Sequence, residues 1–197
     1  MTDHTRSRIA LHCRRFAGDE RGTVLIEGII MLPIMIWCLI ATYVFFDAFR
    51  ARSINIRAAY TISDMLSRET GYITDDYLDS MEQLQDFLVE GLNPSDLRVT
   101  VFSYDADSDS YSVNWSKGRG GMNPISTSQL ADLRHHLPVM PDGENAIMVQ
   151  TIVGYQPRYA VGLPEQDFDD LVVIRPRFAG QLCWNSVEGG NYTTATC

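Results

Sequence analysis

The chain has 197 residues, 45% of them hydrophobic, which is enough for one membrane segment and one modest soluble domain. Its net charge of -9 is uneven, because residues 1–70 carry 9 Arg against 7 Asp and Glu, whereas residues 71–197 carry 7 Lys and Arg against 18 Asp and Glu. An acidic soluble part lacks the basic stripe that nucleic acids require, so we expect no nucleic-acid partner. The simplest role of this charge is solubility.

The apolar run over 23–46 predicts a transmembrane helix in which Glu27 is the only charged side chain. As a helix it is about 36 Å long, more than the roughly 30 Å of a bilayer core. A secretory signal peptide fits poorly, because the run is too long and no small-x-small cleavage site follows it. Pro33 removes one backbone hydrogen bond and is expected to kink the helix, although membrane helices often carry proline.

Arginines flank this run on both sides, five before it and three soon after it. The excess on the first side favours a cytoplasmic N-terminus, with the rest of the chain outside the cytoplasm. We therefore expect a cytoplasmic leader over 1–22, a transmembrane helix over 23–46, an amphipathic stem helix over 47–70 and an extracytoplasmic head over 71–197.

A carboxylate at Glu27 is unexpected, because an ionised group in hydrocarbon costs about 2.5–3.5 kcal/mol. One interpretation is that it reaches the nearby headgroups and is incidental. The other follows from its place five residues after Gly22. Cleavage after Gly22 leaves an α-amino group on Thr23, with a pKa near 8, that can pair with Glu27 of a neighbouring subunit. Such a pair sets the register of assembly more than it adds stability.

The order of basic leader, Gly22, four residues, Glu27 and long apolar helix resembles the processing signature of type IV prepilins. The stretch FAGDERGTVLIEGIIMLPIMIWCLIATY is similar, more narrowly, to the start of the TadE/TadG-like proteins of tight-adherence (Flp, type IVb) pilus systems. The matching residues are Phe16, Arg21, Gly22, Glu27 and Pro33. The segments AIMVQTIVGYQPRY (146–159) and VVIRPRFAGQLCW (172–184) are similar more loosely.

Two departures qualify this resemblance. The leader is longer than many prepilin leaders, and its Cys13 has no assigned role. TadG-like relatives often carry a D-x-S-x-S metal motif, which DADSDS (105–110) does not match, so the shorter TadE-like branch fits better.

The resemblance implies a minor pseudopilin or pilus-assembly protein of the bacterial inner membrane, with no enzymatic activity and no cofactor. It implies cleavage after Gly22 by a prepilin peptidase, a periplasmic head, and packing against other pilus subunits and the assembly platform. The alternative is an unprocessed single-pass anchor that presents a periplasmic binding or sensor domain, with Glu27 incidental.

Apolar residues at helical spacing predict two helices in the region after the membrane segment. The first is the stem over 47–70, which either joins anchor to head or packs as a short helix on its own domain. Its stripe consists of Ile54, Ala58, Ile62, Met65 and Leu66. The second, over 75–90, has Asp75 and Asp76 at its favourable N-terminal end.

The remaining elements predict an antiparallel sheet, and with the helices an α+β fold. Alternation over 97–105 and its return over 110–118 indicate a hairpin. A possible capping box of Ser126 with Gln129 opens a short helix ending at His136. Further strands are expected over 145–155 and 170–178.

Candidate sites of chemistry in the head are weak. His135 and His136 are adjacent, so on a helix they diverge and do not chelate one metal ion. The DADSDS loop opens like a calcium loop, but Ser110 replaces the turn glycine and Ser116 the closing glutamate, so we expect a hairpin tip and no metal site. Trp115 and Trp184 fit a core or an interface better than a stacking platform.

Cys183 and Cys197 lie 14 residues apart in the tail QLCWNSVEGGNYTTATC (181–197), without the spacing of a zinc or redox motif. In an oxidising compartment they can close a loop, worth roughly 3 kcal/mol by the chain-entropy argument. The alternative is two unpaired thiols in a frayed tail.

Overall fold

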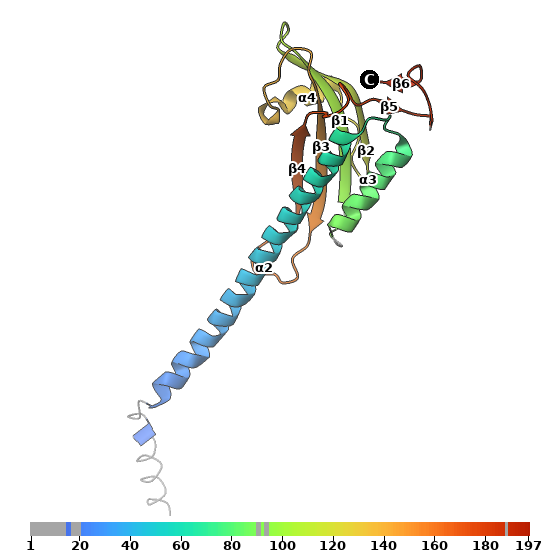
Figure 1. Ribbon diagram of the computed structural model, residues 1–197. Helices are drawn as coiled ribbons and strands as arrows, with labels where there is room; N and C mark the ends of the chain where they lie inside the picture. Colours follow the sequence, from blue (N-terminus) through green and yellow to red (C-terminus); the bar gives the residue numbers. More distant parts are fainter. Residues whose placement is uncertain (1–14, 17–20, 90–91, 93–94, 188) are drawn as a thin grey trace, which may run out of the picture.

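The computed structural model describes residues 15–16, 21–89, 92, 95–187 and 189–197. It shows an α+β fold, as predicted, in which a long helix carries a small head at one end (Figure 1). Most of the proposed leader, including Cys13, lies outside the described residues. In chain order the elements are α2 (Arg21–Arg68), α3 (Asp75–Leu88), β1 (Ser95–Asp105), β2 (Ser110–Arg119), α4 (Thr127–Asp132), the 3-10 turn η1 (Arg134–His136), β3 (Asn145–Tyr155), β4 (Gln166–Ile174), β5 (Trp184–Asn185) and β6 (Ala195–Thr196).

Helix α2 is continuous over 48 residues, so the predicted transmembrane and stem segments form one helix. Its first half is exposed, and from Val44 onward one face packs against the head. Alanines on that face allow the sheet to approach the helix closely. The predicted stripe is correct at Ala58, Ile62 and Leu66 but wrong at Met65, which is 39% exposed. Ile62 and Leu66, one turn apart, already occupy the packed line.

The four long strands form an antiparallel sheet in the order β2-β1-β3-β4. Strand β1 is central, pairing Val99 with Val149 of β3 and, on its other side, with Lys117 of β2. The register between β1 and β2 shifts after Val101, where one extra residue of β2 forms a bulge. Because of this bulge, Trp115 and Val113 face opposite sides of the sheet although they are two residues apart.

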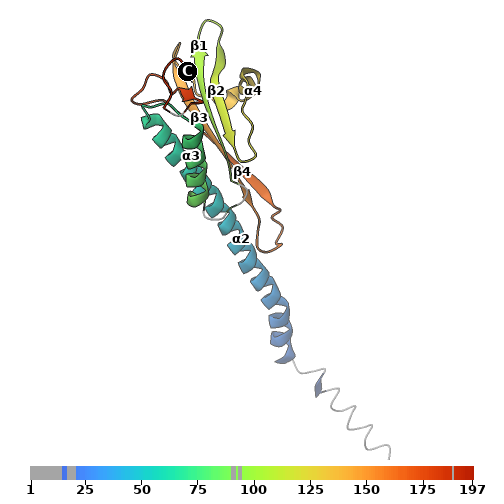
Figure 2. The same ribbon diagram turned by 90° about the vertical axis from the view of Figure 1, so that its right-hand side faces the viewer.

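Each face of the sheet is covered by different elements (Figure 2). Helices α2 and α3 pack on one face, over a core that includes Ile62, Val99 and Trp115. The segment with α4 and η1 packs on the other, over a core that includes Phe102 and Met148. Helix α4 begins as the capping pattern predicts, since the Ser126 backbone N–H donates to Gln129 Oε1 over 2.9 Å.

Strand β4 spans Gln166–Ile174, so the predicted strand over 170–178 started and ended too late. Its first residues alternate with aspartates, which hide the strand pattern, and Pro176 after it cannot donate to a sheet. The chain turns instead to the end of α2, where the Arg177 backbone N–H donates to the Ser67 carbonyl over 2.8 Å. The small two-stranded sheet of β5 and β6 was not predicted. A single parallel bridge joins Trp184 of β5 to Ile73, in the connection between α2 and α3.

Candidate functional site

The residues nominated for processing lie at the free end of α2, far from the head (Figure 1). Gly22 and Thr23 are in the first turn of the helix as described, and Glu27 follows about one turn later with its side chain exposed. Glu27 has no hydrogen bond or ion pair with any residue that the structure describes. The open space around this carboxylate leaves it accessible to a group on another molecule.

The helix beyond Glu27 presents an uninterrupted apolar surface. Every residue from Val24 to Leu39 is exposed. The helix continues through Pro33 without interruption. Within the described residues, this is the one helix long and apolar enough to cross a membrane.

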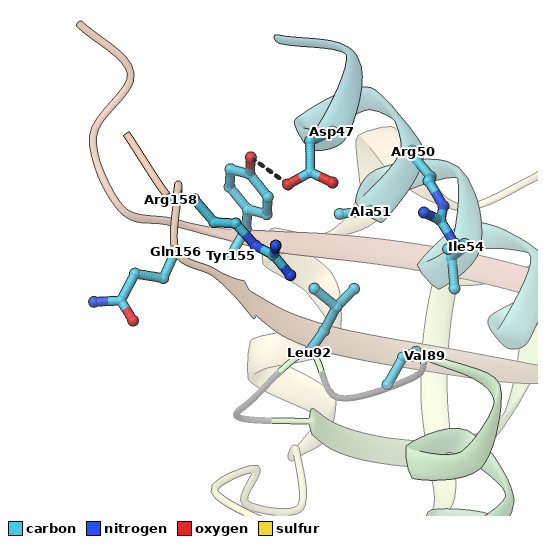
Figure 3. Close-up of a pocket in the computed structure, with 9 residues that line it drawn as sticks. All are labelled: Asp47, Arg50, Ala51, Ile54, Val89, Leu92, Tyr155, Gln156 and Arg158. Atoms are coloured by element: carbon cyan, nitrogen blue, oxygen red, sulfur yellow. Dashed lines mark hydrogen bonds between the residues drawn. The ribbon is translucent and has the colours of Figure 1, made fainter. Parts of the chain in front are cut away.

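A polar contact joins the head to α2 just after the apolar half of the helix (Figure 3). The Tyr155 hydroxyl, at the end of β3, donates to Asp47 Oδ2 over 3.0 Å and lies 3.3 Å from the Val44 carbonyl. Burial, followed by the hydrogen bond to the Asp47 carboxylate, raises the pKa of Tyr155 to about 12. This contact fixes the end of β3 to the point where α2 leaves the head.

A cavity of about 270 Å³ opens beside this contact, between α2, the end of α3 and the loop after β3. Figure 3 shows the Arg158 guanidinium and the Asp47 carboxylate on its polar side, with Leu92 and Val89 on its apolar side. The cavity therefore offers charges of both signs over an apolar floor.

A second polar contact between helix and sheet is buried. Asn55 Nδ2 donates to Asp170 Oδ2 over 2.8 Å and lies 3.2 Å from the Phe168 carbonyl. Both side chains are almost fully buried, and Asn55 Oδ1 has no hydrogen-bond partner. The Asn55 amide fixes the position of β4 along α2. If the strand or the helix shifted, the buried Asp170 carboxylate would lose its hydrogen-bond donor.

The acidic loop 105–110 uses its carboxylates to hold its own turn. Asp105 Oδ1 accepts from the backbone N–H groups of Asp107 and Ser108, and hydrogen bonding from Ser108 lowers its pKa. Asp109, with a φ of 47°, accepts from Arg134 Nη2 over 2.7 Å and from the Tyr104 hydroxyl. This arrangement gives a braced hairpin tip.

No group of three or more His, Cys, Asp or Glu side chains that could hold a metal ion occurs among the residues placed by the structure. His135 and His136 lie side by side in η1 and are exposed.

The tail is closed on itself and anchored to the head. Cys183 and Cys197 form a disulfide, with their Cα atoms 4.3 Å apart, whereas Cys38 is an exposed free thiol on α2. Trp115 is buried and its Nε1 donates to the Leu182 carbonyl over 2.7 Å. Trp184 is half-buried, with Lys117 Nζ 3.6 Å from its ring centroid. Both tryptophans therefore serve packing.

None of the contacts that join α2 to the sheet was predicted from the sequence. Tyr155 belongs to the segment 146–159 noted above, but nothing in the sequence pointed from it to Asp47. Asn55 gave a weak signal, because it is a polar residue directly after Ile54, the first residue of the predicted apolar stripe.

Comparisons with known proteins add no identification. The chain matches no family model, no curated protein and no solved structure.

Proposed function

We propose that the chain is a TadE-like minor pseudopilin or pilus-assembly protein: a membrane protein cleaved after Gly22, whose freed N-terminal helix packs with the helices of other pilus subunits. The observation that carries the proposal is the division of α2 into an exposed apolar half and a half packed on an antiparallel sheet. An anchor of this kind can leave the bilayer and join a bundle, because its apolar surface is covered by none of the residues that the structure describes.

The end of α2 supports the same proposal. The exposed Glu27 carboxylate stands about one helical turn from Thr23, the residue that cleavage would make N-terminal. A carboxylate in an apolar bundle needs a cationic partner, and the new α-amino group of a neighbouring subunit supplies one. The partners implied are the prepilin peptidase, other pilus subunits and the assembly platform.

Processing can be tested with two glycines of the same helix. A Cβ added at Gly22 or at Gly28 meets nothing within 4 Å, so a larger residue at either position leaves the fold of the chain intact. Only Gly22 has to fit the peptidase, where a side chain before the cut obstructs the cleft. In cells with a prepilin peptidase, Gly22→Leu should accumulate at full length, whereas Gly28→Leu should be shortened like the parent chain.

Intact-mass spectrometry of the membrane fraction reads both outcomes. Cleavage of Gly22→Leu at the normal site would contradict the proposal. So would a parent chain that stays at full length in those cells, which favours the alternative of an unprocessed anchor with a binding or sensor head.

A further inference from the structure

We propose that the loop between β3 and β4, residues 156–165, lies in the headgroup region of the bilayer, so that the head rests on lipid through this loop as well as hanging from α2. This inference needs only a membrane-spanning α2. It does not depend on cleavage after Gly22 or on pilus assembly.

The first argument is the length of free helix. The stretch from Val24 to Leu39, where every side chain is exposed, is about 24 Å long at about 1.5 Å per residue, which is shorter than a bilayer core of about 30 Å. Spanning about 30 Å from Val24 takes the helix to Tyr43. Val44 is already buried against the head, so the bilayer surface has to meet the head at this level.

The second argument is that the β3-β4 loop descends to that level. The rings of Tyr159 and Tyr43 meet edge to face, with their centroids 6.4 Å apart. Tyr159 also lines a cavity of about 330 Å³ with Leu39 and Ile40, which belong to the apolar half of α2. Tyr159 remains 52% exposed, so it points partly to whatever surrounds the helix there. Tyrosine, with an apolar ring and a polar tip, suits the membrane interface.

The opposite side of α2 places the interface at the same height. Phe45, Phe46 and Phe49 are 47%, 72% and 68% exposed, although they lie beyond Tyr43. Together with Trp37 they form an aromatic surface on a part of the helix that the head leaves open. Exposed phenyl rings are more stable against lipid than against water, so this side of the helix favours contact with the bilayer as far as Phe49. The helix is therefore at headgroup depth from about Tyr43 to Phe49, the level of the loop.

One basic side chain of the loop, Arg158, can reach lipid phosphates. Arg158 is exposed and forms no ion pair with the described residues, whereas Glu165 accepts a hydrogen bond from the Gln156 side-chain amide. An arginine at the bilayer surface can extend its guanidinium to a phosphate while its aliphatic part stays near apolar groups. We therefore propose lipid headgroups as the binding partner of the loop. The test below also detects the case in which a second protein chain covers the loop instead.

The test places an environment-sensitive fluorophore on single cysteines of the full chain in phospholipid vesicles containing phosphatidylglycerol. The background is Cys13→Ser with Cys38→Ser, labelled without reductant so that the tail disulfide persists. Tyr159→Cys reports the loop. Met31→Cys, on the exposed apolar half of α2, reports hydrocarbon depth, and Val139→Cys, 96% exposed on the α4 side of the head, reports water.

The label at 159 should be quenched by lipids that carry a spin label near the headgroup, and should be shielded from aqueous iodide relative to the label at 139. Replacing phosphatidylglycerol by neutral lipid should weaken the lipid quenching at 159, and Arg158→Gln should reduce that lipid dependence; one basic residue near an anionic surface changes partitioning roughly fivefold.

Two results would overturn the proposal, and a third would overturn its assignment of Arg158 to a lipid phosphate. Iodide quenching at 159 equal to that at 139, with the label at 31 quenched by lipid, means that the chain spans the membrane but the loop stays in water. Shielding from both iodide and spin-labelled lipid means that protein covers the loop. If lipid quenching at 159 changes neither with lipid charge nor with Arg158→Gln, Arg158 does not bind a lipid phosphate.

Discussion

At the scale of single residues, Tyr155 joins the head to the base of the free helix. The hydroxyl donates to Asp47 and is buried, so Tyr155→Phe should lower the free energy of unfolding of the head by about 1.5 kcal/mol at neutral pH. Urea denaturation of the full chain in nonionic detergent, followed by tryptophan fluorescence, measures this. A loss as small as that of an exposed control, Tyr192→Phe, would contradict the role.

The same hydroxyl predicts a pH dependence. Its pKa is about 12 in the folded chain against an ordinary 10.0, so folding favours the protonated form. The stabilisation from this group is therefore complete below pH 10 and is lost as pH rises toward 12. The parent chain should lose more stability than Tyr155→Phe over that interval, and parallel curves for the two proteins would rule the effect out.

The buried Asn55 and Asp170 form a second such contact. Asn55→Ala leaves the Asp170 carboxylate without its amide donor and should cost about 1–3 kcal/mol of stability. Because the two residues act as a pair, Asn55→Ala combined with Asp170→Ala should cost less than the sum of the single changes. Additive costs, measured by the same denaturation, would show that the pair is not coupled.

At the scale of elements, the tail behaves as a loop closed by a disulfide and attached to the α2-α3 connection. The Ile73 backbone N–H donates to the Cys183 carbonyl, and the Asn185 backbone N–H to the Ile73 carbonyl, both over 2.8 Å. Cys183→Ser with Cys197→Ser should therefore destabilise the head by about 3 kcal/mol. Cys38→Ser, at an exposed thiol away from the head, should leave stability unchanged. Equal stability of all three proteins would contradict a structural role for the disulfide.

Elements with a clear period were predictable, whereas those set by their neighbours were not. Helix α3 and the β1-β2 hairpin follow from apolar spacing. The N-terminal cap of α3, at Thr74, is also a local feature of the sequence. The bulge before Trp115 depends on which face of the sheet each side chain must reach. The bounds of β4 depend on pairing with β3, and the exposed Asp167 and Asp169 obscure the strand pattern in the sequence.

At the scale of the whole molecule, the sequence predicted an α+β fold with one long N-terminal helix and a small head, and the structure shows this fold. The sequence did not predict how low the head sits on that helix. This depends on Tyr155, Asn55 and the β3-β4 loop, residues far apart in the chain that meet only after folding.

The exposed Glu27 predicts an effect on assembly and not on folding. Glu27→Gln keeps the size of the side chain and removes its charge, so the chain should still be cleaved but should no longer co-purify with other pilus subunits. Met31→Leu, on the same exposed surface, is the matched control and should co-purify normally. Normal co-purification of Glu27→Gln would show that the charge does not set register.

The most direct test of the account is the N-terminus of the protein taken from membranes of the cells that naturally produce it. N-terminal sequencing should begin at Thr23, with the arginine-bearing leader absent. A chain that begins at Met1 or Thr2, in cells that assemble pili normally, would contradict processing after Gly22 and with it the pilin function proposed for this helix.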